Sequence, residues 1–268
     1  MKVSPFFVGN FDMNRRKADE QLPVYYGIDN IEVEMLWMTP LESEEWKRTM
    51  AHMVKATEGK EPTNEELEML NEDILKGGLQ HALENIIVIF KVKNCSRAFT
   101  HQVVRHRKMR FHQHGLRWSV PLGFRFNSVN EIDEETKKEI EEHWNKTIKL
   151  FNKLIDKGFP NEDARSILPI GTATYIIVET DLKAFADAFS YRGCAMFMPE
   201  TQHIFWRMRD LIVEKYPFLE NMLRLACEKQ QVCTYQGMED VDKQCNAPWK
   251  VKRIYKSYVN EVKENEEK

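Results

Sequence analysis

The sequence lacks a long apolar run, a paired-cysteine motif and an internal repeat. No window approaches the roughly 18 to 20 apolar residues of a membrane-spanning helix, and the first residues carry charges where a signal peptide has its apolar core. The five cysteines are odd in number and form no CxxC pair, which favours free thiols in a reducing compartment. These absences predict a cytoplasmic protein that does not contact a membrane.

A zinc site is the alternative interpretation of the cysteines. Cys227, Cys233 and Cys245 lie close together in the sequence. Their spacing matches none of the usual ligand patterns of structural zinc sites. We therefore expect no metal.

Acidic residues are absent from one central segment. Between Glu84 and Glu131 there is no Asp or Glu over 46 residues, although 30% of the chain is charged and the net charge is only −3. A basic segment without acids indicates a local site for an anion, and guanidinium groups suit phosphate through their fork of donors. This acid-free segment contains nine cations: Lys91, Lys93, Arg97, Arg105, Arg107, Lys108, Arg110, Arg117 and Arg125.

The acid-free segment is also compatible with two different roles. Its cations could form a solvated face that pairs with acids from elsewhere in the chain, or they could line a nucleic-acid groove. The cations cluster beside an apolar stretch at residues 85–93, and the whole chain is slightly acidic. These two features disfavour a nucleic-acid partner.

Apolar patterning predicts helices and strands without a regular alternation, which indicates the α+β class. A capping box at Thr63 and Glu66 marks one helix start, and Thr180 is a candidate N-cap for another. Strands are expected at 85–93 and 172–180. Helices are expected at 42–57, from 63 onward, and at 96–105, 131–157, 181–192, 199–214 and 217–230.

The helix at 131–157 has the strongest amphipathic pattern. Ile140, Trp144, Ile148, Phe151 and Leu154 fall on one stripe, with Lys and Glu opposite. The length allows one large domain or two closely associated ones. Because no Gly/Ser-rich linker divides the chain, we expect a single domain over residues 1–268, with a frayed tail at 250–268.

A triplet in the basic segment belongs to a larger pattern. Arg105, His106 and Arg107 follow Gln102 by three residues, and Arg117 lies ten residues beyond the triplet. This arrangement resembles the flavin-dependent thymidylate synthases. Their motif runs Arg-His-Arg, seven residues, Ser, and often Gly-Arg-Tyr, with a substrate-binding glutamine upstream.

The resemblance continues downstream in the same order. "EDARSILP" at 162–169 is similar to the family's Glu-x-x-Arg-x-x-Leu-Pro segment and contributes Arg165. "DLKAFADAFSYR" at 181–192 is similar to a family helix that ends in a pyrimidine-contacting arginine, here Arg192. The matching motifs extend over about residues 78–220.

Several positions depart from the family pattern. Gly115 stands where the family has Ser, and His112-Gln113 stands where it has Asn-Glu. These departures predict a divergent member whose cofactor site is better retained than its substrate site. The other departures are Trp118 for Tyr, Met196 for His, Asp187 for Asn, and Leu79 with His81 in a loosely matched segment before the first strand.

The resemblance implies a fold with a central, mostly antiparallel sheet flanked by helices. It also implies C5 methylation of dUMP with FAD, methylenetetrahydrofolate and NADPH, in a homotetramer with shared active sites. Arg192 would stabilise negative charge on the pyrimidine, which makes it the catalytic candidate. The cofactor candidates are Arg105, His106, Arg107, His112, Glu84 and Asp187. The candidates for binding the pyrimidine nucleoside monophosphate are Gln102, Gln113, His114, Gly115, Arg117 and Arg165.

Alternatives remain open at this stage. The substrate could be UMP or a cytidylate, and the product could carry a methyl or a hydroxymethyl group. The chain could also be a silent flavoprotein or, from another class, a nucleic-acid-binding protein. At single residues, Arg165 could form a surface ion pair with Glu162, Arg192 could only complement a helix end, and Cys194 could be a nucleophile.

Overall fold

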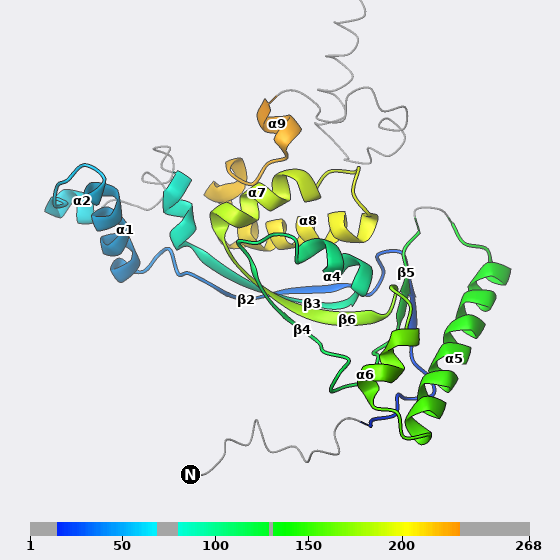
Figure 1. The fold of residues 1–268 in the computed structure, drawn as a ribbon. Helices are drawn as coiled ribbons and strands as arrows, with labels where there is room; N and C mark the ends of the chain where they lie inside the picture. The colour runs from blue at the N-terminus through cyan, green and yellow to red at the C-terminus, as the bar shows by residue number, and fades with distance from the viewer. Residues whose placement is uncertain (1–14, 69–79, 129–130, 231–268) are drawn as a thin grey trace, which may run out of the picture. The chain divides into compact units, whose positions relative to one another are not determined.

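The structure is a computed structural model that describes residues 15–68, 80–128 and 131–230. It contains a four-stranded antiparallel sheet in the order β2-β3-β6-β4 and a separate parallel pair, β1-β5 (Figure 1). The α+β prediction is therefore confirmed. The strands are β1 (Val24–Tyr26), β2 (Glu32–Met38), β3 (Ile87–Ser96), β4 (Arg110–Gln113), β5 (Phe124–Phe126) and β6 (Ala173–Asp181).

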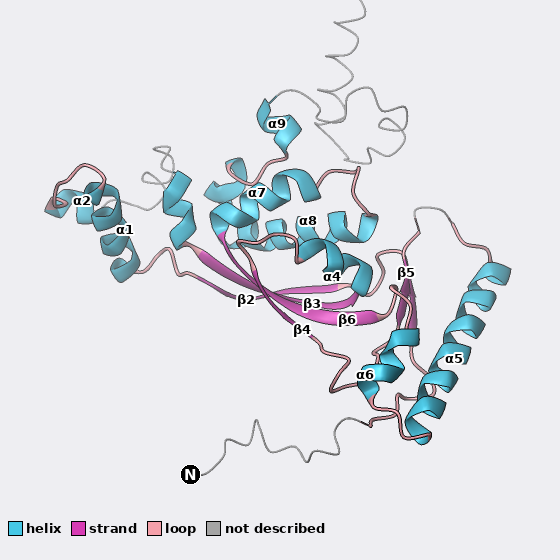
Figure 2. Cartoon of the chain, viewed as in Figure 1, coloured by secondary structure: helices cyan, strands magenta, loops and turns pink. Residues whose placement is uncertain are grey.

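Along the chain, helices and strands follow one another without a regular alternation (Figure 2). None of the helices in the described ranges is long and apolar enough to cross a membrane. The helices are α1 (Glu44–Ala56), α2 (Asn64–Glu68), α4 (Arg97–Val103), α5 (Glu134–Asp156), α6 (Asn161–Ala164), α7 (Leu182–Arg192), α8 (Pro199–Lys215) and α9 (Ala226–Gln230). Short 3-10 helices are η2 (Gln80–Asn85), η3 (Arg165–Ile167) and η4 (Pro217–Asn221).

The chain divides into two compact units. Unit 1 comprises Met1–Glu32, Val92–Arg105 and His112–Ile177, and unit 2 comprises Val33–Lys91, His106–Phe111 and Val178–Lys268. Strands β3, β4 and β6 each contribute residues to both units. The single domain expected over residues 1–268 stays a prediction.

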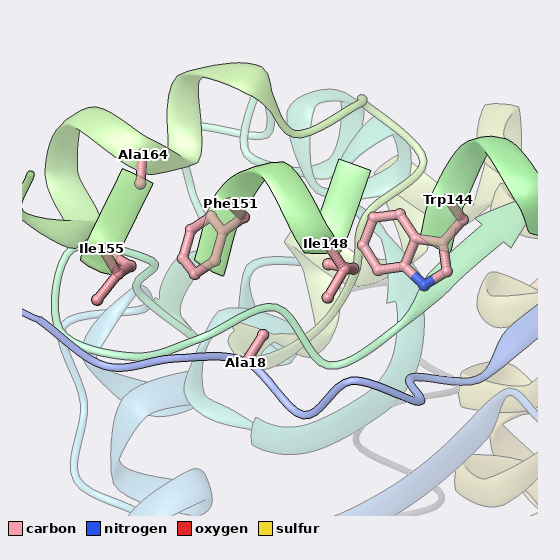
Figure 3. Close-up of a cluster of buried hydrophobic side chains, with 6 residues drawn as sticks. All are labelled: Ala18, Trp144, Ile148, Phe151, Ile155 and Ala164. Carbon is pink, nitrogen blue, oxygen red and sulfur yellow. The ribbon is translucent and has the colours of Figure 1, made fainter. Parts of the chain in front are cut away.

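The core of unit 1 forms along helix α5. Asp133 caps this helix by accepting a hydrogen bond from the Thr136 backbone N–H at 2.8 Å. Ile155 is buried in the stripe where Leu154 was expected, and Leu154 packs only at the edge of the cluster. The reason is the helical period, because positions 144, 148, 151 and 155 stay on one face. Figure 3 shows the buried cluster: Ala18, Trp144, Ile148, Phe151, Ile155 and Ala164.

Local capping signals precede two of the helices, α4 and α2. Ser96 ends β3 and caps α4, and its hydroxyl accepts from the Phe99 backbone N–H at 3.1 Å. The capping box is confirmed in unit 2, because the Thr63 N–H donates to Glu66 Oε2 at 2.9 Å and the Glu66 N–H donates to Thr63 Oγ1 at 3.3 Å. These caps fix where α4 and α2 begin.

The predicted cap at Thr180 is wrong. Asp181, one residue later, caps α7 by accepting from the Ala184 backbone N–H at 2.7 Å. Thr180 is fully buried at the end of β6. Strand side chains alternate between the two faces, so the side chain of Thr180 points into the core, away from the first turn of α7.

The continuous helix expected at 217–230 is also wrong. The structure has η4 and then α9, with residues 222–225 outside any helix. Leu223 and Leu225 are both buried at 1% exposure. Two residues apart on an α-helix would point to nearly opposite sides, so the chain leaves the helix to bury both.

Candidate functional site

Most cations of the acid-free segment have an acidic partner from another segment. These ion pairs are largely exposed, and such pairs contribute little to stability. The interpretation of a basic face paired with distant acids is therefore right for five of the nine cations. The pairs are Lys91–Glu34, Lys93–Glu32 at 3.1 Å, Lys108–Glu84 at 3.6 Å, Arg110–Glu179 and Arg117–Glu162 at 3.1 Å.

Arg125 has a structural role in unit 1. Its side chain is buried, with 1% of the residue exposed. The guanidinium donates to the carbonyl oxygens of Asn94 at 2.6 Å, Gly27 at 2.7 Å and Asp29 at 2.8 Å. It also lies over the Tyr25 ring, 5.1 Å from the ring centroid. Arg125 therefore joins three chain segments and is not available to an external anion.

The two arginines of the triplet are exposed in the loop between α4 and β4. Arg105 belongs to unit 1 and Arg107 to unit 2. Neither forms an ion pair with an acid in the part of the chain that the structure describes. Their donors therefore remain available, as a phosphate-binding role requires.

His106 and Arg192 meet within unit 2. Arg192 is the last residue of α7, and its Nε donates to His106 Nε2 at 3.0 Å. Burial, and then the charge of Arg192, lower the pKa of His106 below its usual value of 6.5. The imidazole is therefore neutral at pH 7 and can accept this hydrogen bond. The structure thus brings the catalytic candidate against one member of the triplet.

The end of α7 is held by packing against α8. The Arg192 guanidinium lies 4.7 Å from the centroid of the Phe197 ring. The carbonyl of Gly193 accepts from Trp206 Nε1 at 2.9 Å. A Cβ at Gly193 would lie 2.8 Å from Leu225 Cδ2 and 2.9 Å from Phe189 Cε2, so a side chain there would collide with its neighbours. These contacts fix the backbone beside Arg192.

The two acidic residues expected to bind the cofactor are exposed in unit 2. Glu84, in η2, pairs with Lys108 at 3.6 Å, and Asp187, in α7, pairs with Lys183 at 2.5 Å. Each carboxylate therefore already has a lysine partner. Cys194 follows α7 and is only partly buried.

In unit 1, Glu162 contacts two of the residues expected to bind the substrate. Arg117 Nε lies 3.1 Å from Glu162 Oε2, and Arg165 Nη2 lies 3.7 Å from Glu162 Oε1. Arg165 Nε also donates to the Glu162 carbonyl at 3.2 Å. The expected alternative for Arg165, an ion pair with Glu162, is thus present, but the same carboxylate also holds Arg117. Two nucleotide-binding candidates therefore share one carboxylate.

The remaining substrate candidates lie on α4 and β4. Gln113, in β4, donates through Nε2 to the Thr100 hydroxyl of α4 at 2.9 Å. Gln102 is partly buried on α4. His112 is exposed on β4. The amide that replaces the family's glutamate is therefore fixed by α4.

His114 follows β4 and is half-buried. Its Nε2 hydrogen-bonds to Ser119 Oγ, and its ring stacks on Tyr175 with centroids 5.7 Å apart. Its Nδ1 is buried without a hydrogen-bond partner. Burial, and then the charge of Arg97, lower the pKa of His114. A polar atom that is buried and unpaired in this way is a candidate ligand contact.

Gly115 is exposed, and a Cβ built on it would meet no atom within 4 Å. No packing therefore requires glycine at this position. The absence of the family's serine hydroxyl is a difference in chemistry and not a steric necessity.

Arg97 is a cation of unit 1 that the sequence motifs did not single out. Arg97 was counted among the nine cations, but it lies outside the motifs that carry the resemblance. The structure shows that its Nη1 is buried without a partner and that its charge acts on Arg165 and His114. The sequence signal available was only its place in the acid-free segment.

No group of three or more His, Cys, Asp or Glu that could hold a metal occurs in residues 15–68, 80–128 and 131–230. Cys227 lies in α9, whereas Cys233 and Cys245 fall outside the described residues. The expectation of no metal stays a prediction.

Comparison with known proteins identifies the family. The model of the Thymidylate synthase complementing protein family (Thy1) matches residues 35–218. The chain belongs to this family. The matched residues include α4, β4 and α7, and with them every candidate residue for catalysis and for binding cofactor or substrate.

Curated relatives of this Thy1 chain are named flavin-dependent thymidylate synthase. The one from Sulfolobus acidocaldarius is 30% identical over 162 residues, which cover 60% of this chain and 62% of that protein. The one from Pyrococcus furiosus is 32% identical over 184 residues, covering 66% and 75%. The chain thus spans less than two thirds of the length of the Sulfolobus relative.

Solved structures share the fold. The crystal structure of the UMP/dUMP methylase PolB from Streptomyces cacaoi, bound with 5-Br UMP, matches with a TM-score of 0.56 at 15% sequence identity. The match covers 76% of this chain and 99% of that one. At this identity the likeness establishes the fold alone.

Proposed function

We propose that the chain catalyses FAD-dependent C5 methylation of a pyrimidine deoxynucleotide, of the dUMP to dTMP type, using methylenetetrahydrofolate and NADPH. The hydrogen bond between Arg192 and His106 carries this proposal. It links the arginine expected to contact the pyrimidine with a triplet expected to bind the flavin. Membership in the Thy1 family supports the same chemistry.

The residues of the triplet fit FAD. Arg105 and Arg107 are exposed cations with no acidic partner in the described chain, which suits the phosphates of the cofactor. FAD supplies the redox chemistry of the reaction. His112, Glu84 and Asp187 complete the proposed cofactor site, and the last two must part from their lysines to contact it.

The protein's part in the reaction is placement and electrostatics. Arg192 stabilises negative charge on the pyrimidine oxygens, and His106 fixes the direction of its guanidinium. Arg117 and Arg165 bind the nucleotide phosphate, while Gln102 and Gln113 contact the sugar and the base. The backbone N–H groups around His114 and Gly115 assist in phosphate binding. As in the family, we propose a homotetramer.

A second candidate is a related reaction on UMP or a cytidylate, with transfer of a methyl or hydroxymethyl group. The observation that favours it is the change at the nucleotide site. Gly115 carries no hydroxyl, and Gln113 is an amide that already donates to Thr100. A silent flavoprotein is the remaining alternative, and it predicts flavin binding without any response to a nucleotide.

Arg107→Ala is expected to weaken FAD binding about tenfold to a hundredfold. The physical reason is the loss of a charge-assisted hydrogen bond to phosphate, which contributes about 1.5 to 3 kcal/mol. The measurement is a flavin titration followed by absorbance or fluorescence.

Arg110→Ala is the matched control for this experiment. It removes the same charge from the same segment, but Arg110 is exposed and paired with Glu179. Its FAD affinity should stay within about twofold of wild type. If Arg107→Ala binds flavin as tightly as wild type, the triplet does not bind FAD. A wild-type protein that binds no flavin would remove the proposed function.

Restoring serine at position 115 tests the nucleotide site. Gly115→Ser fits without a clash and should leave stability unchanged. Its hydroxyl should tighten the binding of pyrimidine monophosphates by about threefold to tenfold, the effect of one neutral hydrogen bond. Isothermal titration with dUMP, UMP and dCMP measures this effect.

The wild-type chain should choose loosely among the same nucleotides. A site that lacks a hydroxyl contact loses the discrimination which that contact provides. We expect turnover ratios between pyrimidine monophosphates below about a thousandfold. A stronger preference for dUMP over every other monophosphate would contradict this prediction.

A further inference from the structure

The carbonyl group that follows Arg192 is held by two donors from α8. Gly193 is the residue after α7, and carbonyls at the end of an α-helix have no partner within that helix. The Gly193 carbonyl accepts from Trp206 Nε1 at 2.9 Å and from Gln202 Nε2 at 3.3 Å. Both donors belong to unit 2, as Arg192 does, and they are four residues apart, so they share one face of α8. This face of α8 therefore fixes the end of α7.

The Trp206 ring is held by contacts that do not involve its N–H. The rings of Trp206 and Phe189 meet at 86° with their centroids 4.9 Å apart, a favourable edge-to-face arrangement. The Arg209 guanidinium lies 5.7 Å from the centroid of the Trp206 ring, and its Nη2 donates to Glu220 at 2.9 Å. The indole therefore reaches the Gly193 carbonyl without a further loss of side-chain freedom.

Helix α8 also contacts the imidazole that pairs with Arg192. The Phe205 ring is buried at 1% exposure, and its centroid lies 6.1 Å from that of the His106 ring. Arg192 Nε donates to His106 Nε2 at 3.0 Å. One helix thus contacts both the backbone beside the donor and the ring of the acceptor. Because hydrogen bonds weaken steeply when they are misaligned, a shift of the end of α7 along α8 would weaken this one.

We propose that Trp206 is a positioning residue for Arg192. Its indole N–H, assisted by the amide of Gln202, holds the Gly193 carbonyl and thereby keeps the Arg192 guanidinium directed at His106. Trp206 acts only through the end of α7, without contact with the reacting atoms. That the held guanidinium serves pyrimidine methylation rests on the proposed function, whereas the hydrogen bond that Trp206 maintains does not depend on that function.

Trp206→Phe removes the indole N–H but keeps an aromatic ring in its place. We expect the limiting rate of nucleotide-dependent flavin oxidation to fall about threefold to tenfold, the effect of one neutral hydrogen bond. The nucleotide concentration that gives half of this rate should change by less than about twofold, because Arg192 acts on charge that develops in the transition state. Gln202→Leu removes the longer bond and should lower the limiting rate by a smaller factor. It leaves the aromatic packing in place, so it provides the same test if Trp206→Phe does not fold.

Trp46→Phe is the matched control for Trp206→Phe. Trp46 lies on α1 in the same unit, and its Nε1 is buried without a hydrogen-bond partner. The same substitution there removes no hydrogen bond, so the limiting rate should stay within about twofold of wild type. A second comparison combines Trp206→Phe with Arg192→Ala. Because Trp206 acts through Arg192, the double variant should react no more slowly than Arg192→Ala alone.

The hydrogen bond of Arg192 is also measurable without turnover. In ¹H–¹⁵N NMR spectra of the full-length chain, the Nε–H signal of Arg192 is the one that disappears in Arg192→Ala. Its exchange with water should be slow in wild type and in Trp46→Phe, because this N–H donates to His106. In Trp206→Phe the exchange should be about threefold to tenfold faster, since the same hydrogen bond no longer opposes local opening. This measurement requires neither flavin nor nucleotide.

Trp206 is not a positioning residue if Trp206→Phe leaves the limiting rate or the Nε–H exchange at its wild-type value. The same conclusion follows if Trp46→Phe loses as much, or if the double variant is slower than Arg192→Ala by the full factor of Trp206→Phe. A higher half-saturating nucleotide concentration at an unchanged limiting rate would also overturn it, in favour of a role in nucleotide binding. Failure of the proposed function looks different. In that case wild type shows no nucleotide-dependent oxidation, while the Nε–H exchange still depends on Trp206 and not on Trp46.

Discussion

Replacing Arg192 with alanine is expected to lower the rate of nucleotide-dependent oxidation of the reduced flavin by about 10² to 10³. Losing one preorganised donor to developing negative charge typically has this effect. Arg192 is suited to the role because His106 and the Phe197 ring fix its guanidinium before any ligand arrives. Stopped-flow absorbance of the reduced flavin, with and without nucleotide, measures the rate.

Cys194→Ala is the matched control for Arg192→Ala. Cys194 lies two residues beyond Arg192 and is partly buried. If the chemistry needs no covalent thiol, the cysteine variant should react at nearly the wild-type rate. Both variants must first be shown to bind flavin. A nearly inactive cysteine variant beside an active arginine variant would move the reaction to a thiol mechanism.

The same rate should fall in acid. The pKa of His106 is lowered from 6.5, mainly by burial and then by Arg192, so the imidazole is neutral above about pH 6.5 and can accept from Arg192. As the pH falls through the lowered pKa, the imidazolium loses its acceptor and repels the guanidinium. The contribution to stability has the same sign: it is present above pH 6.5 and is lost as the pH falls. A pH profile of wild type and Arg192→Ala checks this, because the variant should lack the His106-dependent part of the acid loss.

Arg125→Met is expected to lower the free energy of unfolding by about 3 to 5 kcal/mol, because it removes three hydrogen bonds from a charged donor, which contribute about 1.5 to 3 kcal/mol each when fully buried. The methionine fills a similar volume, but it leaves the carbonyls of Asn94, Gly27 and Asp29 without their donor. An acceptor that loses its donor costs free energy wherever water cannot replace that donor. Urea unfolding followed by fluorescence measures the change.

Arg110→Met provides the comparison for Arg125→Met. Arg110 belongs to the same acid-free segment, but 68% of its side chain is exposed and its partner is a single carboxylate. The expected loss is below about 1 kcal/mol. Equal losses in the two variants, or a loss below about 1 kcal/mol for Arg125→Met, would show that the three carbonyl contacts do not hold unit 1 together.

Local chemistry made much of the fold predictable. The capping box at Thr63 and Glu66 forms as expected, and β3, β6 and α5 lie where their apolar patterns indicated. These signals act over a few residues, so the sequence carries them directly. Prediction failed where burial overrode the local signal, at the cap of α7 and in the break after η4.

The candidate site was also predictable only in part from the sequence. The motifs identified the family and named Arg105, His106, Arg107 and Arg192 from their order and spacing alone. Spacing could not show that Arg192 donates to His106, 86 positions away, because that contact depends on how α7 ends beside α8.

The sequence by itself determined the family, the α+β class and the positions of the cations. Only the tertiary structure decided which cations are neutralised. Five have acids brought from distant segments, Arg125 donates to backbone carbonyls, and Arg97 is partly buried with its Nη1 unpaired. The physical reason is that a residue's charge is fixed by its type, whereas its solvation and its partners depend on contacts between residues far apart in the chain.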